Sequence, residues 1–148
     1  MTDRRLGAAA LALAVAGVAV AGYLTYVHYA GIAPVCNIAH GCVKVQTSPW
    51  SELAGVPVAL LGLLGYSAIL ATLFVPGEGA RLAAAGLGVS GFGFSAYLTY
   101  REVFSIEALC QWCLLSQALM AGLALVTCVR LVRGPDPEAG LAPAMAVH

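Results

Sequence analysis

Residues 110–132 read CQWCLLSQALMAGLALVTCVRLV. The part after the second cysteine has a single charged residue, Arg130, and is long enough for a helix across the roughly 30 Å hydrocarbon core of a membrane. A C-x-x-C pair that opens such a helix lies where free backbone N–H groups and the helix dipole stabilise a thiolate. Cys110 and Cys113 are therefore predicted to be redox-active, with a static disulfide or half of a metal site as the alternatives.

The rest of the chain has the composition of a membrane protein. Of its 148 residues 61% are hydrophobic and 9% charged, whereas a soluble domain carries about 25% charged residues. Four apolar stretches predict membrane-spanning helices at about residues 6–29, 56–75, 82–100 and 114–132. We expect an all-α integral membrane protein with a four-helix domain at 1–134 and a disordered cytoplasmic tail at 135–148. The net charge is zero and the basic residues are scattered, so no basic patch indicates binding to nucleic acid.

Basic residues predict the orientation. Five of the seven fall on one side of the expected spans: Arg4, Arg5, Arg81, Arg130 and Arg133. By the positive-inside rule this side is cytoplasmic and holds both termini, in the plasma (inner) membrane. The other side then carries Cys36, Cys42, Cys110 and Cys113, in a compartment that permits disulfides. The first span resembles a cleavable signal, but its apolar run continues to about residue 29, so we expect it to be retained.

The segment between the first two spans has about 26 residues, which is long for a simple connection and typical of a functional loop. It contains Cys36 and Cys42. Ser48 followed by Pro49 is typical of a helix N-cap and first turn, and Gly55 of a stop. The pattern predicts a short helix on the outer membrane surface, with Trp50 and Leu53 facing inward.

Two features of the third span have more than one interpretation. Its last residues, Tyr97-Leu98-Thr99-Tyr100, repeat Tyr23-Leu24-Thr25-Tyr26 of the first span, and each copy lies the same distance before a cysteine. A common origin of the two halves is one explanation; the preference of tyrosine for membrane interfaces, together with chance, is the other. The many glycines and serines of residues 86–95 indicate either close helix packing or space for a flat ligand.

Two cysteine pairs on one side of a bundle can work in series. Thiol–disulfide exchange moves two electrons at a time, so the loop pair could serve a soluble protein and the Cys110–Cys113 pair a lipid-soluble acceptor. Four outward thiolates could instead bind a soft metal such as zinc or copper(I). We expect, however, that the protein has no metal site.

The order of the motifs carries a resemblance. Cys36-x5-Cys42, Thr47-Ser48-Pro49-Trp50, Gly55-Val56-Pro57 leading into Gly62, and Cys110-x-x-Cys113 together resemble the vitamin K epoxide reductase family, particularly its bacterial members, over about residues 6–133. The resemblance implies a four-helix bundle around a quinone, such as ubiquinone or menaquinone, capped by the first outer loop. It also implies a membrane thiol oxidoreductase that makes disulfides in a thioredoxin-fold, DsbA-like partner. We expect this partner to be a separate protein, because many bacterial relatives have it fused after the bundle, whereas this chain ends about 15 residues past its last span.

The resemblance also implies roles for single residues. Cys113 would face the quinone, and Cys110 would be its resolving partner. Cys36 and Cys42 would form a shuttle pair, in which Cys42 takes electrons from the partner protein and Cys36 passes them to Cys110. Ser48, with Trp50 nearby, would lie beside the quinone pocket.

Departures from the family pattern narrow the function. Gln117 and Val58 replace a tyrosine and an asparagine of the vertebrate enzymes, which favours an ordinary quinone over vitamin K epoxide. The DsbB type of quinone reductase is disfavoured, because it has its C-x-x-C in the first outer segment, the reverse of the order here.

Other side chains carry weaker predictions. Glu102 and Glu107 are expected to be solvated, and Arg101 to snorkel at the interface. Cys128 is expected to be inert packing. His28 and His40 are candidates for moving protons, although interfacial and loop histidines commonly have no role.

Overall fold

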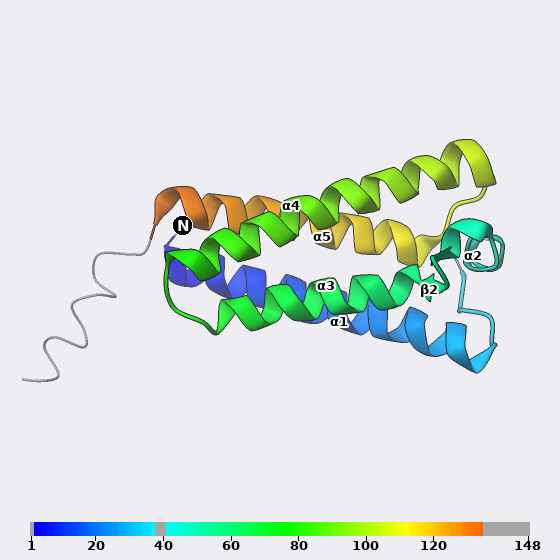
Figure 1. Cartoon of the computed structure of the whole chain (residues 1–148), viewed down its shortest axis with the longest axis horizontal. Helices are drawn as coiled ribbons and strands as arrows, with labels where there is room; N and C mark the ends of the chain where they lie inside the picture. Colours follow the sequence, from blue (N-terminus) through cyan, green and yellow to red (C-terminus); the bar gives the residue numbers. More distant parts are fainter. Residues whose placement is uncertain (1, 38–40, 135–148) are drawn as a thin grey trace, which may run out of the picture.

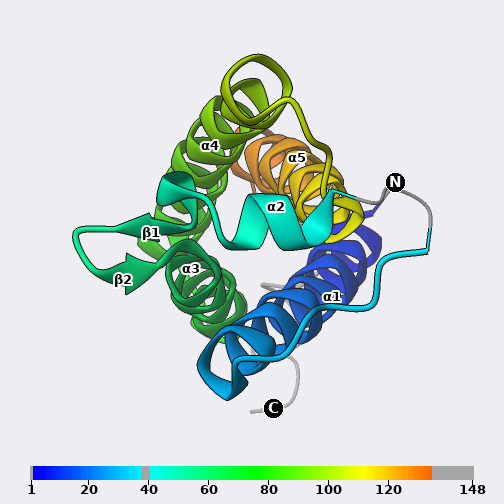
Figure 2. The same ribbon diagram turned by 90° about the vertical axis from the view of Figure 1, so that its right-hand side faces the viewer.

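The computed structural model describes residues 2–37 and 41–134, and in this part of the chain four long helices form a bundle (Figure 1). They are α1 (Asp3–Ala30), α3 (Val58–Leu73), α4 (Glu78–Arg101) and α5 (Gln111–Arg133). Neighbours pack in the closed order α1–α3–α4–α5–α1, as the end view in Figure 2 shows. The expected tail at 135–148 and His40 lie outside the described residues.

Local sequence sets the ends of the helices. The hydroxyl oxygen of Thr2 accepts a hydrogen bond of 3.3 Å from the N–H of Arg5 and so caps α1. Gly31 ends α1 with φ at 68°, a left-handed conformation that glycine adopts without strain. Gly134 follows α5 with φ at 71°.

Of the helices in the described residues, three are long and apolar enough to cross a membrane: α1, α5, and α4 together with the π-helical turn η2 (Glu102–Ile106). The fourth, α3, has 16 residues and is shorter than the expected span at 56–75. The difference arises at both ends, because Val56 and Pro57 form a strand and the chain leaves the helix at Phe74.

The segment between α1 and α3 differs from the single helix that the sequence predicts. It forms α2 (Cys42–Gln46), a 3-10 turn η1 (Pro49–Ser51), and a hairpin of β1 (Glu52–Leu53) and β2 (Val56–Pro57). Ala54 and Gly55, both at positive φ, turn the chain and pair Leu53 with Val56. Leu53 is therefore 55% exposed, and the prediction that it faces inward is wrong. α2 lies across the end of the bundle (Figure 2).

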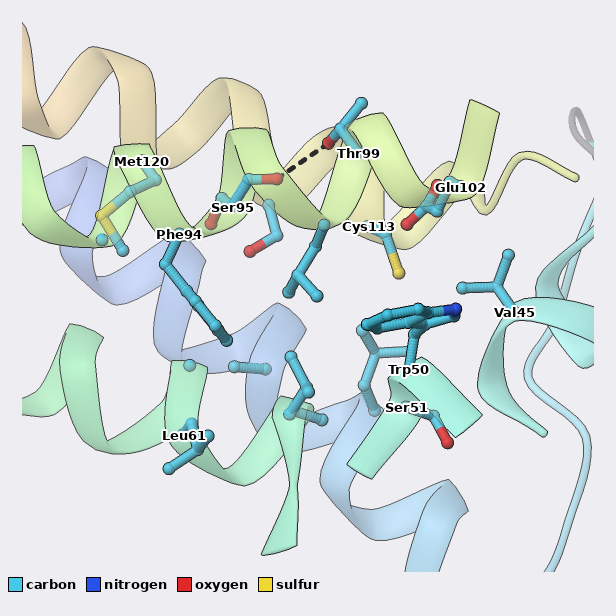
Figure 3. Close-up of a pocket in the computed structure, with 18 of the residues that line it drawn as sticks. Val45, Trp50, Ser51, Leu61, Phe94, Ser95, Thr99, Glu102, Cys113 and Met120 are labelled. Atoms are coloured by element: carbon cyan, nitrogen blue, oxygen red, sulfur yellow. Dashed lines mark hydrogen bonds between the residues drawn. The ribbon is translucent and has the colours of Figure 1, made fainter. Parts of the chain in front are cut away.

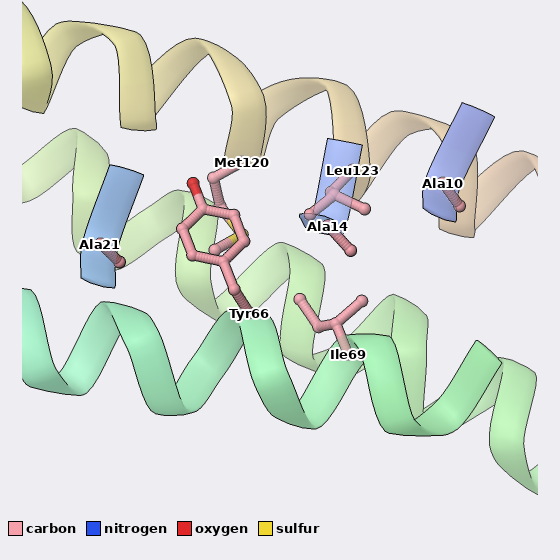
Figure 4. Packing of buried hydrophobic residues seen from close by; sticks show 7 residues of the cluster. All are labelled: Ala10, Ala14, Ala21, Tyr66, Ile69, Met120 and Leu123. Atoms are coloured by element: carbon pink, nitrogen blue, oxygen red, sulfur yellow. The ribbon is translucent and has the colours of Figure 1, made fainter. Parts of the chain in front are cut away.

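Tyr66 joins three helices at the centre of the core (Figure 4). Its ring, on α3, packs so closely on Gly17 of α1 that a Cβ there would overlap it. Its hydroxyl donates a hydrogen bond of 2.7 Å to the carbonyl of Ser116 on α5. In α4, Gly88 lies against Ala124 of α5, so close packing accounts for this small residue.

An ion cluster joins α1, α4 and α5 at the end of the bundle opposite α2. Asp3 binds Arg81 at 2.7 Å and Arg130 at 3.1 Å, and Arg81 also donates to the carbonyl of Arg130 at 2.9 Å. Arg81 and Arg130, which the sequence predicts to share one side, thus lie at the same end.

Candidate functional site

Four of the five cysteines gather at the α2 end of the bundle. Cys42 and Cys110 are fully buried in one cluster with Val45 and Ile106, and Cys36 and Cys113 pack against it. Cys36 and Cys42 are joined by a disulfide, whereas Cys110 and Cys113 are free thiols. A disulfide and a dithiol therefore lie in one packed cluster.

The residues between Cys110 and Cys113 hold the loop in place. Trp112 Nε1 donates a hydrogen bond of 2.6 Å to the carbonyl of Val35. Gln111 Oε1 accepts one of 3.1 Å from the N–H of Asn37. Both neighbours of Cys36 are thus bound to the start of α5, and the ring of Tyr23 on α1 supports Trp112 at 5.0 Å between centroids.

Gly41 lets the loop approach the segment before Cys110. A Cβ at this position would lie 2.6 Å from the carbonyl oxygen and 2.7 Å from the nitrogen of Leu109, closer than van der Waals contact allows. Cys42 can therefore reach the cluster only because its predecessor is glycine. Sequence reasoning missed this role, since one glycine beside a cysteine gives no signal without its spatial neighbours.

Cys110 is the residue directly before α5, and its thiol is unusually acidic. A hydrogen bond from the Cys113 side chain lowers the pKa of Cys110 from 9.0 to about 7, outweighing the opposing effect of burial. Thiolate is the nucleophilic form of cysteine, so Cys110 is prepared for disulfide exchange near neutral pH.

An apolar cavity opens beside Cys113. It has a volume of about 160 Å³, close to the roughly 150 Å³ of an apolar cavity that holds a benzene ring. Figure 3 shows the Cys113 sulfur between Glu102 and Trp50. Side chains from all four long helices and the loop line it, including Leu24, Val45, Leu61, Phe94, Ser95 and Met120. The cavity therefore has room for a flat ring next to a thiol.

Trp50 covers the cavity from the loop. The guanidinium of Arg101 lies 4.2 Å from the centre of the Trp50 ring, and the Tyr97 ring meets it edge-on at 6.4 Å. Arg101, expected to snorkel at the interface, binds an aromatic side chain of the loop. Tyr97 and Tyr23, the first residues of the repeated Tyr-Leu-Thr-Tyr sequence, thus each support a tryptophan of the site.

Ser48 has a different contact from the predicted one. Its hydroxyl donates to the carbonyl of Val45 at 2.7 Å and does not cap the following turn, so the prediction of a side-chain cap is wrong. Ser48 borders a second hollow at the end of α1, whereas Ser51 lines the cavity beside Cys113. His28 also borders this hollow and lies 3.2 Å from Glu52.

Two polar residues that sequence reasoning did not select lie next to the thiols. Gln46 Nε2 is 3.7 Å from Cys113 Sγ. Glu102 is only 3% exposed, and its Oε2 accepts a hydrogen bond of 3.4 Å from the N–H of Cys110. The expectation of a solvated Glu102 is wrong because η2 prolongs α4 and turns this side chain inward, while Glu107 is exposed as expected. Ser95, Thr99 and Glu102 follow one another at helical spacing and all line the cavity beside Cys113. This spacing is the sequence signal that could have identified Glu102 as part of the site.

A disulfide and a dithiol packed at one end of a bundle of apolar helices can exchange electrons with each other. The model of the vitamin K epoxide reductase family matches residues 8–128 of the 148-residue chain, and all four clustered cysteines fall inside the match. The chain belongs to the vitamin K epoxide reductase family, as its motifs predict.

Proposed function

We propose that this protein makes disulfides in an extracytoplasmic thioredoxin-fold protein and passes the electrons through its two cysteine pairs to a membrane quinone, ubiquinone or menaquinone. One observation carries the proposal: the Cys36–Cys42 disulfide and the Cys110–Cys113 dithiol share a packed cluster, and Cys113 lines the apolar cavity. Cys110 and Cys113, called the inner pair below, thus lie next to the cavity that would hold the electron acceptor. Cys36 and Cys42, called the outer pair, form the disulfide that can oxidise a partner.

Burial favours an order within the outer pair. Cys42 is fully buried beside Cys110, whereas Cys36 is partly exposed. We infer that Cys36 meets the partner and that Cys42 exchanges with Cys110. This order is the reverse of the one expected from the resemblance, because α2 turns Cys42 toward the bundle.

The cavity fits the ring of a quinone. Its lining is mainly apolar, Trp50 covers its outer side, and Cys113 provides a sulfur at its edge. A bound quinone would supply a two-electron, two-proton acceptor. Ser48 keeps an indirect role in this proposal, as the residue that fixes the turn from α2 to the segment of Trp50 through Val45.

Membrane placement completes the proposal. All four long helices cross the inner membrane, α3 with the help of its flanking residues because 16 helical residues span only about 24 Å. The end with Asp3, Arg81 and Arg130 is cytoplasmic, as are both termini, and the cysteine cluster is extracytoplasmic.

The test is quinol formation by purified protein in detergent, supplied with a reduced thioredoxin-fold protein of the DsbA type and with ubiquinone or menaquinone. Wild-type protein and Cys128→Ala, which changes the cysteine outside the cluster, should turn over equally, and Cys113→Ala should be inactive. Wild-type protein that forms no quinol with either quinone contradicts the proposal.

A metal-transfer function, which would need the Cys36–Cys42 disulfide to be reduced, is the second candidate. Among residues 2–37 and 41–134 no three His, Cys, Asp or Glu side chains are grouped to hold an ion. Stoichiometric zinc or copper in the purified protein, together with no quinol formation, would favour this candidate.

A further inference from the structure

Glu102 is a buried acid beside both Cys110 and Cys113. It is 3% exposed, and its Oε2 accepts a hydrogen bond of 3.4 Å from the N–H of Cys110. It also lines the cavity beside Cys113 (Figure 3). The hydrogen bond from Cys110 does not explain why residue 102 is an acid, because an amide would accept the same backbone hydrogen bond.

Among residues 2–37 and 41–134, no positively charged side chain is paired with Glu102. Arg101, its neighbour in α4, points over the rings of Trp50 and Tyr97 and binds Ser105, and Lys44 of α2 is exposed. In the part of the chain that the structure describes, the titratable groups that face Glu102 are thus Cys110 and Cys113. A buried charge without a counter-ion is costly, and two such charges in contact are more so.

We propose that Glu102 and Cys110 share one negative charge. While the inner pair is reduced, Cys110 is a thiolate and Glu102 carries a proton, and Glu102 releases this proton when the pair becomes a disulfide. Glu102 is then a proton donor to the quinone as it is reduced to the quinol. The role of Glu102 as a proton donor rests on the proposed function, because it needs a quinone as the acceptor. The sharing of charge between Glu102 and Cys110 does not depend on the proposed function.

The step balances. Oxidation starts from the Cys110 thiolate, the Cys113 thiol and the Glu102 acid. The S–S bond between Cys110 and Cys113 forms, and two electrons leave with one proton from Cys113 and one from Glu102. These are the electrons and protons that convert a quinone to its quinol. Glu102 is left as the carboxylate.

The return step balances as well. Cys36 and Cys42 form their disulfide and reduce the inner one. Of their two protons, one goes to Cys113 and the other to Glu102, and Cys110 becomes a thiolate again. The site therefore holds one negative charge throughout the cycle.

Infrared difference spectroscopy tests the sharing of charge without any quinone. In quinone-free protein, chemical oxidation of the inner pair should remove the band of a protonated carboxyl group, and the signal should be absent in Glu102→Gln. Glu107→Gln, which changes an exposed acid of the same segment, should keep the signal. A band that does not change on oxidation, or that persists in Glu102→Gln, overturns the inference even if the protein reduces quinones.

A single-turnover experiment tests the role in catalysis. In Glu102→Gln, quinol formation from the pre-reduced protein should slow roughly 100-fold, the lower range for loss of a general acid. Reduction of the Cys36–Cys42 disulfide by a small dithiol should stay unchanged, because Glu102 has no part in it and Gln keeps the hydrogen bond to Cys110. Unchanged quinol formation in this variant overturns the proton-donor role, whereas inactive wild-type protein would overturn the proposed function instead.

Discussion

Gln46 Nε2 lies 3.7 Å from the sulfur of Cys113, so the loop helix α2 reaches the reactive end of α5. The amide can stabilise negative charge on the sulfur as it develops. A hydrogen bond to a charged group contributes about 1.5 kcal/mol, so Gln46→Leu should slow quinol formation from pre-reduced protein roughly tenfold. Stopped-flow absorbance of the quinone measures this rate.

Lys44→Gln is the matched control for this change. Lys44 is on the exposed face of the same short helix, so its replacement should alter the rate by less than about twofold. Equal slowing in both variants would mean that α2 had simply unfolded, and no slowing in Gln46→Leu would exclude a role for the amide.

Gly41→Ala should separate the two cysteine pairs. The added methyl group meets the backbone of Leu109, so the loop must move and carry Cys42 away from Cys110. A displacement on the order of 1 Å can slow a reaction roughly 100-fold. Acid quenching and alkylation should reveal this loss in electron transfer from the outer to the inner pair. Gly86→Ala, where no atom lies within 4 Å of the added carbon, should transfer electrons at the wild-type rate.

The acidity of Cys110 can be measured directly. In a variant with Cys36, Cys42 and Cys128 replaced by alanine, the ultraviolet absorbance of the thiolate should rise as the pH increases through about 7. Because a hydrogen bond from Cys113 is the main cause, further replacement Cys113→Ala should move the rise toward pH 9.0. An identical titration of the two proteins would refute this cause.

The ion cluster at the opposite end predicts a loss of stability. Asp3→Asn keeps the shape of the side chain but removes the charge that Arg81 and Arg130 share. The free energy of unfolding should fall by about 2 kcal/mol, measured by denaturant titration in detergent. Glu78→Gln, at an exposed position of α4, is the control and should change little. Equal stability of Asp3→Asn and wild-type protein would show that the cluster contributes nothing.

Periodicity and composition predicted most of the helices but missed the start of α3. Long apolar runs predicted α1, α4 and α5 within a few residues, because any such run must bury its backbone polar groups in a helix. The start of α3 was missed because the turn at Ala54 and Gly55 pairs Val56 in a hairpin, a local contact that hydropathy does not register.

The cysteines of the site could be predicted, whereas their polar neighbours could not. Their spacing and order identified both pairs. Gln46 and Gly41 were missed because each acquires its role from a segment distant in sequence, α5 for Gln46 and Leu109 for Gly41. Glu102 was missed because the π-helical turn η2, which hydropathy does not predict, turns it toward Cys110. Ser48 was assigned to a cap from local sequence, and the carbonyl of Val45 competed successfully for its hydroxyl.

Trapping the link between the two pairs tests the electron path most directly. In the double variant Cys36→Ala, Cys113→Ala, mild oxidation should give a Cys42–Cys110 disulfide, which mass spectrometry of non-reduced peptides detects. In Cys42→Ala, Cys113→Ala, the corresponding Cys36–Cys110 disulfide should form far more slowly, because Cys42 is the one buried beside Cys110. Faster formation of Cys36–Cys110, or no link in either variant, would contradict the relay described here.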